Sequence, residues 1–200
     1  MNIKDFRETT LYEWPEIFKR QREINNQFDP DYDDKAANFD ISYHEDQELF
    51  KHYCWCITEE LMEAIEAVEL EEPTHIKEEV IDALNFTIQL YGLYGWGYDK
   101  LEEETRMAME TQINPSSDTM DYCILNAVYA IGMAANCLKN RQWRESQYLV
   151  DLYVFEPRLR KIWYEMLLVC KSIGLENDED IRRLWDLKYQ VNKFRIESKY

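Results

Sequence analysis

The chain has 200 residues, a net charge of -17 and 46% hydrophobic residues. This length allows a single domain with a sizeable core, and the aromatic content of 14% argues against disorder. The acidic balance disfavours nonspecific binding to nucleic acid or to an anionic membrane. It does not exclude a nucleotide substrate, because metal ions can bridge acidic side chains to phosphate.

Helical periodicity and turn residues predict an all-α protein, a helical bundle built around an antiparallel helix hairpin. A first helix is expected at about residues 12–26, followed by a loop over 29–45 and the hairpin at about 46–94. A further helix is expected at about 98–110, and an apolar helix is expected to begin after an N-cap at Ser117 or Asp118. A short helix at about 142–154 leads to Pro157, and two last helices are expected at about 158–172 and about 178–198.

The five cysteines include no pair with zinc-finger spacing, and no signal peptide is recognised at the N-terminus. We therefore expect a cytoplasmic protein with reduced thiols that pack as small apolar residues. The apolar stretch 122–138 is interrupted by polar residues and is shorter than the ~20 residues of a bilayer span, so it predicts a buried helix. Trp55 is expected to pack in the core.

The predicted hairpin carries two acidic motifs, Glu60-x-x-Glu63 and Glu79-x-x-Asp82. When the two segments are aligned, their apolar stripes superimpose, so each motif lies at the same edge of a buried helix face. The two stripes contain the following residues: Ile57, Leu61, Ala64 and Ile65, and Ile76, Val80, Ala83 and Leu84. Three other acids are expected to point away from the core: Glu59, Glu66 and Glu78.

An antiparallel hairpin could direct these four carboxylates into one cleft. Such a concentration of negative charge raises the pKa of each carboxyl unless a cation neutralises it. Magnesium prefers oxygen ligands and is the natural candidate. The alternative is that the acids form a solvated surface, as on many acidic helices.

The C-terminal helix departs from the acidic pattern, with six Lys or Arg and only two acids between residues 182 and 200. Leu184, Leu187, Val191 and Phe194 form its expected core stripe. Lys188, Asn192 and Arg195 form a second stripe beside it. Basic side chains on one face can bind phosphate oxygens, although such a stripe can also simply offset the acidic remainder of the surface.

These residues resemble the all-α nucleotide pyrophosphohydrolases, which include the MazG proteins and the dimeric dUTPases. The superfamily pattern EExxE…ExxD is matched by Glu59-Glu60-x-x-Glu63 and Glu79-x-x-Asp82. The C-terminal spacing of Lys188, Asn192, Arg195 and Tyr200 is similar to that of the dimeric dUTPases and related phage dCTPases.

The resemblance implies magnesium-dependent hydrolysis of a deoxynucleoside triphosphate to the monophosphate and pyrophosphate, with dUTP favoured and dCTP possible. It implies two or more Mg²⁺ ions held by Glu60, Glu63, Glu79 and Asp82, with Glu63 a candidate base for the attacking water. The substrate-binding residues that it implies are Gln21, Asn25, Asn85, Lys188, Asn192, Arg195 and Tyr200. Among these, Lys188 and Arg195 also neutralise charge that develops on the phosphate.

The implied protein is a single domain spanning residues 1–200 and a homodimer, with neither nucleic acid nor membrane as partner. Residues 105–155 fall outside the resemblance and are expected to form an insertion or a rearranged segment. Tyr189, Ile196 and Lys199 differ from the family pattern, so the base stays open. Two alternatives remain: a broad MazG-like pyrophosphatase that acts on non-standard nucleotides, and a non-enzymatic acidic helical protein that binds a basic partner.

Overall fold

The computed structural model describes residues 2–6, 8–114, 119–138 and 149–198. All regular structure in this part of the chain is helical, which confirms the predicted all-α class. Besides two short 3-10 helices, Ile3–Asp5 (η1) and Tyr98–Lys100 (η2), it contains these α-helices: α1 Trp14–Phe28, α2 Tyr32–Asn38, α3 His44–Glu69, α4 Pro73–Leu93, α5 Glu102–Glu110, α6 Met120–Ala135, α7 Leu152–Ser172 and α8 Asp178–Ser198. None of these helices has both the length and the apolarity that a bilayer crossing demands.

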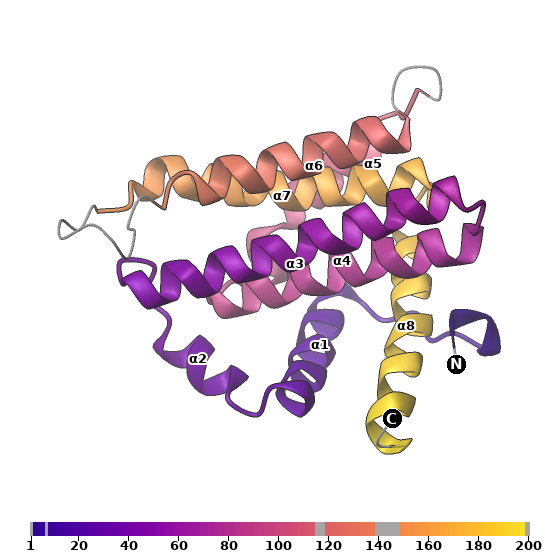
Figure 1. Ribbon diagram of the computed structural model, residues 1–200, viewed down its shortest axis with the longest axis horizontal. Coiled ribbons are helices and arrows are strands. Elements are labelled where there is room, and N and C mark those ends of the chain that lie inside the picture. Colours follow the sequence, from indigo (N-terminus) through magenta and orange to yellow (C-terminus); the bar gives the residue numbers. More distant parts are fainter. Residues whose placement is uncertain (1, 7, 115–118, 139–148, 199–200) are drawn as a thin grey trace.

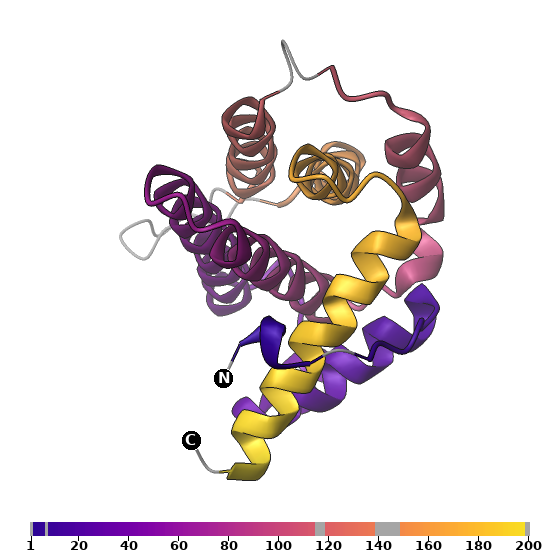
Figure 2. The ribbon, with the colours of Figure 1, turned by 90° about the vertical axis from the view of Figure 1, so that its right-hand side faces the viewer.

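The α3–α4 hairpin forms the middle of the molecule (Figure 1). Only residues 70–72 separate the end of α3 at Glu69 from the start of α4 at Pro73, so the two helices run antiparallel. On one side they pack against the α6–α7 pair, and on the other side lie α1, α2 and α8. Figure 2 shows α8 crossing the hairpin obliquely beside α1. The site described below lies between the hairpin and this second group of helices.

The core is centred on Trp163 of α7, which is fully buried. Its ring makes edge-to-face contacts with Trp14 and Tyr91, with centroid distances of 5.1 and 5.9 Å. Its Nε1 donates to Thr105 Oγ1 at 2.8 Å, so the buried indole donor is satisfied. Trp163 thereby ties α1, α4 and α5 to α7, and the segment 105–155 contributes to the same core through α5, α6 and the start of α7.

Two hydrogen bonds place α1 beside α8. Trp14 Nε1 donates to Asp178 Oδ1 at 2.5 Å, and the backbone N–H of Thr10 donates to the buried Asp186 at 2.8 Å. Charge-assisted bonds of this kind are stronger than neutral ones. The segment before α1 therefore lies alongside α8, and α1 packs on the same side of α4 as α8 does.

Three expectations about helix limits are corrected. The predicted loop over 29–45 contains α2, which Tyr32 attaches to α4 by donating its hydroxyl to the Gln89 carbonyl at 2.7 Å. The N-cap of α6 is Thr119, which accepts from Tyr122 N, whereas Ser117 and Asp118 lie outside the described residues. Pro157 lies inside α7 and does not separate two helices, although a proline lacks the N–H of a helical bond. Of the predicted helix 142–154, residues 142–148 lie outside the described part.

Burial agrees with the predicted hairpin stripes, since Ile57, Leu61, Val80 and Leu84 are all fully buried. Trp55 is 60% exposed, so its expected place in the core is wrong. Its neighbour Cys54 is buried, so the two side chains lie on different faces of α3. All five cysteines are free.

Candidate metal centre

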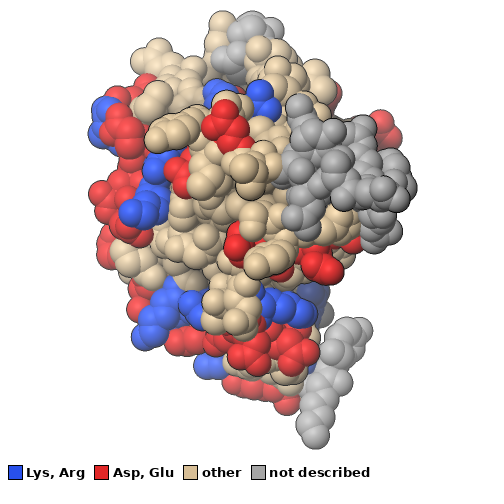
Figure 3. All heavy atoms as spheres, turned by 90° about the vertical axis from the view of Figure 1, so that its left-hand side faces the viewer, with Lys and Arg blue, Asp and Glu red and all other residues tan. Residues whose placement is uncertain are grey.

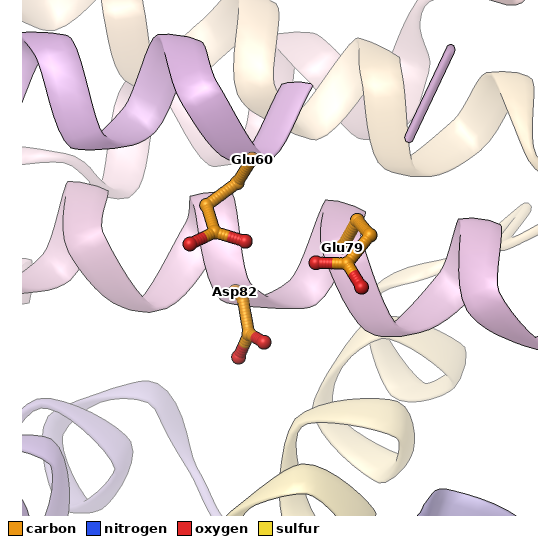
Figure 4. Close-up of side chains that lie close together, drawn as sticks. All are labelled: Glu60, Glu79 and Asp82. Atoms are coloured by element: carbon orange, nitrogen blue, oxygen red, sulfur yellow. The ribbon is translucent and has the colours of Figure 1, made fainter. Parts of the chain in front are cut away.

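The hairpin brings three of the predicted carboxylates together. Glu60 projects from α3, and Glu79 and Asp82 project from α4 on the same side of the hairpin (Figure 4). One oxygen of each lies within 4.8 Å of the others. Glu79 is only 8% exposed, and the other two are half-buried. The shared helical phase of the two motifs therefore becomes a compact acidic cluster.

The cluster strongly perturbs the protonation of Glu60. Burial, a hydrogen bond with Glu79, and the negative charges of Asp82, Glu79 and Glu63 raise the pKa of Glu60 from 4.5 to about 8. Each of these causes disfavours the ionised carboxyl. In the absence of a cation the cluster is therefore expected to keep a proton on Glu60 near neutral pH.

Asp82 already has a cationic partner. Lys188 Nζ lies 2.5 Å from Asp82 Oδ2, and the lysine is only 4% exposed. Burial raises the pKa of Asp82 although the charge and hydrogen bond of Lys188 lower it. Lys188 therefore belongs to the interior of the site, between α8 and α4, and not to a surface stripe.

Asn85 adds an acceptor that has no donor. Its Nδ2 donates to Asp82 Oδ1 at 3.3 Å, while its Oδ1 is buried and without a hydrogen-bond partner. An unsatisfied buried carbonyl is costly in a folded protein. Three carboxylates and an orphaned amide oxygen form a donor set that fits a hard divalent cation such as Mg²⁺. The same oxygen could instead accept an N–H group of a ligand.

A cavity of about 310 Å³ adjoins the carboxylates. This volume is at the small end of the range for ligand pockets. It is lined by residues of α1, α3, α4 and α8: Gln21, Ile24, Asn25, Phe28, Glu60, Asp82, Asn85, Phe86, Gln89 and Asn192. Gln21 Nε2 donates to Asn25 Oδ1 at 2.9 Å, and both side chains are buried. The cavity therefore combines apolar walls with several amide groups, next to the acidic cluster.

The other predicted site residues are placed differently. Glu63 is exposed and is not one of the three clustered ligands. Arg195 is also exposed and does not line the cavity, whereas Asn192 does. Tyr200 lies outside the described residues. Within the expected core stripe of α8, Leu184 and Val191 are buried, but Phe194 is 41% exposed.

The sequence did not predict a role for His75 or for four cavity residues, Ile24, Phe28, Phe86 and Gln89. His75 precedes Glu79 by one helical turn, and its Nε2 lies 2.5 Å from Glu79 Oε1. Burial lowers the pKa of His75, but the hydrogen bond to Glu72 and the charges of Glu79 and Glu72 outweigh it and raise that pKa. The spacing of four between His75 and Glu79 was the signal that could have identified this contact.

The surface charge is mixed on the face that Figure 3 shows. Lys and Arg atoms lie among Asp and Glu atoms there, without a continuous basic area. Among the described residues, many of the ion pairs join two side chains of the same helix, such as those of Arg106 with Glu103 and Glu110. Exposed pairs of this kind contribute little to stability.

No family model, no curated protein and no solved structure matches the chain. The resemblance to the all-α nucleotide pyrophosphohydrolases therefore depends on the motif residues themselves.

The raised pKa of Glu60 predicts a pH-dependent stability in the absence of divalent cations. The folded protein keeps a proton on Glu60 that the unfolded chain releases above about pH 4.5, so its contribution is complete below that pH and is lost as the pH rises towards about 8. The slope is at most ~1.4 kcal/mol per pH unit, and less for a half-buried group. We expect thermal unfolding in EDTA to show a melting temperature that falls over this window, and Glu60→Gln to flatten that dependence. Parallel curves for the two proteins would contradict the prediction.

Proposed function

We propose that this protein is a divalent-cation-dependent nucleoside triphosphate pyrophosphohydrolase that forms a nucleoside monophosphate and pyrophosphate. The observation that carries the proposal is the convergence of Glu60, Glu79 and Asp82 beside a cavity of about 310 Å³. A cluster of carboxylates suits metal-bridged phosphates, and a cavity with amides and aromatic rings suits a base and sugar. An acidic interaction surface would not require a cavity beside the carboxylate cluster, and neither would a solvated helix face.

The proposed centre holds magnesium through Glu60, Glu79 and Asp82, with Glu63 as a further ligand from α3. When bound, Mg²⁺ polarises the phosphoryl group and lowers the pKa of a coordinated water. Glu63 is exposed and lies one helical turn from Glu60. We assign Glu63 the role of general base, which accepts the proton of the attacking water.

The adjoining cavity is the proposed site of the nucleoside. Gln21 and Asn25 are hydrogen-bonded to one another on the wall of this cavity, and the unpartnered Oδ1 of Asn85 can accept from a ligand N–H. Asn192 of α8 lines the same cavity and is assigned to the phosphate tail. Arg195 of α8 is assigned the same role, and so is Tyr200, which lies outside the described residues. We favour dUTP, with dCTP as the second candidate.

The proposal includes a homodimer. Several large apolar side chains are exposed on α3 and α6, two helices that pack against each other: Trp55, Met62, Tyr122, Leu125 and Tyr129. Exposed apolar surface of this kind is what a second copy would cover.

The test is a panel of dNTPs incubated with the purified chain and Mg²⁺, in which pyrophosphate and monophosphate are both quantified. We expect release of pyrophosphate that EDTA abolishes and that one base accelerates by a large factor. Equal rates for all bases would indicate a broad MazG-like enzyme and contradict the dUTP preference. Absence of turnover with every nucleotide, in Mg²⁺ and in Mn²⁺, would show that the proposed activity is wrong.

A further inference from the structure

A second cavity lies between α6 and α7, which pack on the side of the hairpin away from α1 and α8 (Figure 1). Its volume of about 450 Å³ is within the range of ligand pockets. The polar side chains that line this α6–α7 groove are Tyr122, Asn126 and Tyr129 of α6, and Arg158, Lys161 and Glu165 of α7. The groove is therefore separate from the acidic cluster and its cavity.

One end of the groove holds a buried carboxylate with an unused acceptor. Glu165 is 6% exposed, and its Oε1 lies 2.7 Å from Lys161 Nζ. Its Oε2 is buried and has no hydrogen-bond partner among the described residues. A buried acceptor without a donor is costly, and such groups are rare in folded proteins. Glu165 therefore marks a place where the N–H group of a ligand would be stabilised.

The other end of the groove holds a guanidinium. Arg158 precedes Glu165 by seven residues on α7, which is about 10 Å along the helix axis. Its Nη1 donates to the Met133 carbonyl at 2.9 Å and lies 3.1 Å from the sulfur of Cys137, and neither of these partners is a carboxylate. Because guanidinium binds phosphate oxygens with paired donors, Arg158 suits the anionic end of a ligand.

The α6 wall of the groove supplies two aromatic rings. Tyr122 and Tyr129 are 50% and 66% exposed, and their spacing of seven residues places them on one face of α6. Nucleobases stack on exposed aromatic rings of this kind. The groove thus offers an acceptor, two rings and a cation to one molecule.

We propose that the α6–α7 groove binds a guanine mononucleotide, with the base against the tyrosines and its N–H edge on Glu165. The phosphate then lies at Arg158. Guanine presents two neighbouring N–H donors on one edge, which a carboxylate can accept. Uracil presents a single N–H between two carbonyl oxygens, which the carboxylate would repel. The site therefore prefers a different base from the proposed catalytic site and does not depend on the proposed activity.

Entry of the base requires Lys161 to move aside, because Oε2 of Glu165 is closed off from water. Lys161 is held loosely, since its side chain is 53% exposed. Its ammonium also lies 4.3 Å from the centroid of the Tyr164 ring, a contact that it can keep when Glu165 accepts from a ligand. The N–H groups of guanine then replace the ion pair.

The experiment titrates the full chain with GMP, UMP and guanosine in EDTA, which removes metal-bridged binding at the acidic cluster. Photo-cross-linking with 8-azido-GMP, followed by mass spectrometry, locates the bound base. The variants are Glu165→Gln, whose amide donor opposes those of guanine, and Tyr129→Ala at an exposed position. The matched control is Asp121→Asn, an exposed acid of α6. Glu79→Gln reports on the catalytic cavity.

We expect GMP to bind at least ~10-fold more tightly than UMP or guanosine and to label α6. Glu165→Gln should lose the preference for GMP over UMP, and Tyr129→Ala should bind GMP about 10-fold more weakly. Asp121→Asn and Glu79→Gln should leave GMP binding unchanged.

Three results would overturn the inference and leave the proposed function standing. The first is equal affinity for GMP and UMP, or a preference that Glu165→Gln retains. The second is loss of GMP binding in Glu79→Gln, which would place the nucleotide in the catalytic cavity. The third is absence of GMP binding at concentrations where sedimentation shows a dimer, since a second copy would then fill the groove.

Discussion

Replacement of Glu79 by glutamine is expected to lower magnesium-dependent pyrophosphate release by about three orders of magnitude. Glu79 is the most buried of the three clustered carboxylates, and it contacts both Glu60 and His75. The amide keeps the shape of the side chain but removes the negative charge that a divalent cation requires. Quantification of pyrophosphate at saturating nucleotide and Mg²⁺, with cation affinity measured by titration, checks this expectation.

The matched control is Glu66→Gln. Glu66 lies on the same hairpin, also carries a carboxylate, and is exposed, so its loss is expected to change the rate by less than about 2-fold. Both variants should remain folded, because the Glu79 change removes one charge from a crowded cluster and the Glu66 change is made at an exposed position. The metal centre would be refuted by a Glu79→Gln protein that retains the wild-type rate, or by an equal loss in both variants.

The α3–α4 hairpin could be predicted because its information is local. A buried stripe with a period of 3.6 residues shows which face each helix turns inward, and the acidic motifs keep a constant phase to that stripe. Burial of Ile57, Leu61, Val80 and Leu84 confirms the two stripes. The convergence of Glu60 with Glu79 then follows from the antiparallel pairing.

Lys188 could not be placed in the same way. Helical spacing put it beside the core stripe of α8, and lysine is rarely buried, so a surface position near phosphate was the natural expectation. Its burial depends on the oblique crossing of α8 over α4, which brings Nζ to Asp82 from a distant part of the chain. No local pattern contains that crossing.

The short helix α2 and the orphaned oxygen of Asn85 were missed for similar reasons. α2 has seven residues, too few to show a clear period, and it is held by the contact of Tyr32 with α4. A side chain at position 92 would meet the Tyr32 hydroxyl, because a Cβ there would lie 2.6 Å from it, and glycine allows the close approach. Both features depend on tertiary contacts, which sequence periodicity does not report.

The second large effect concerns stability and follows from Lys188. Substitution by methionine keeps most of the side-chain volume but leaves Asp82 partly buried beside Glu60 and Glu79 without its cationic partner. Removing one member of a buried ion pair typically costs 3–5 kcal/mol. In EDTA at neutral pH, we therefore expect Lys188→Met to lower the free energy of unfolding by about 3 kcal/mol, measured by urea denaturation.

The control is the double variant Lys188→Met/Asp82→Asn, in which neither charge is left unpaired. It should recover much of the lost stability, because the cost arises from the isolated carboxylate more than from the loss of the pair. Mg²⁺ should likewise stabilise Lys188→Met more than the wild type, since the ion can take the place of the missing ammonium beside Asp82. If the loss is the same with aspartate and with asparagine at position 82, Lys188 does not act through Asp82. A loss that Mg²⁺ leaves unchanged would instead show that no cation reaches Asp82, and would count against the metal centre itself.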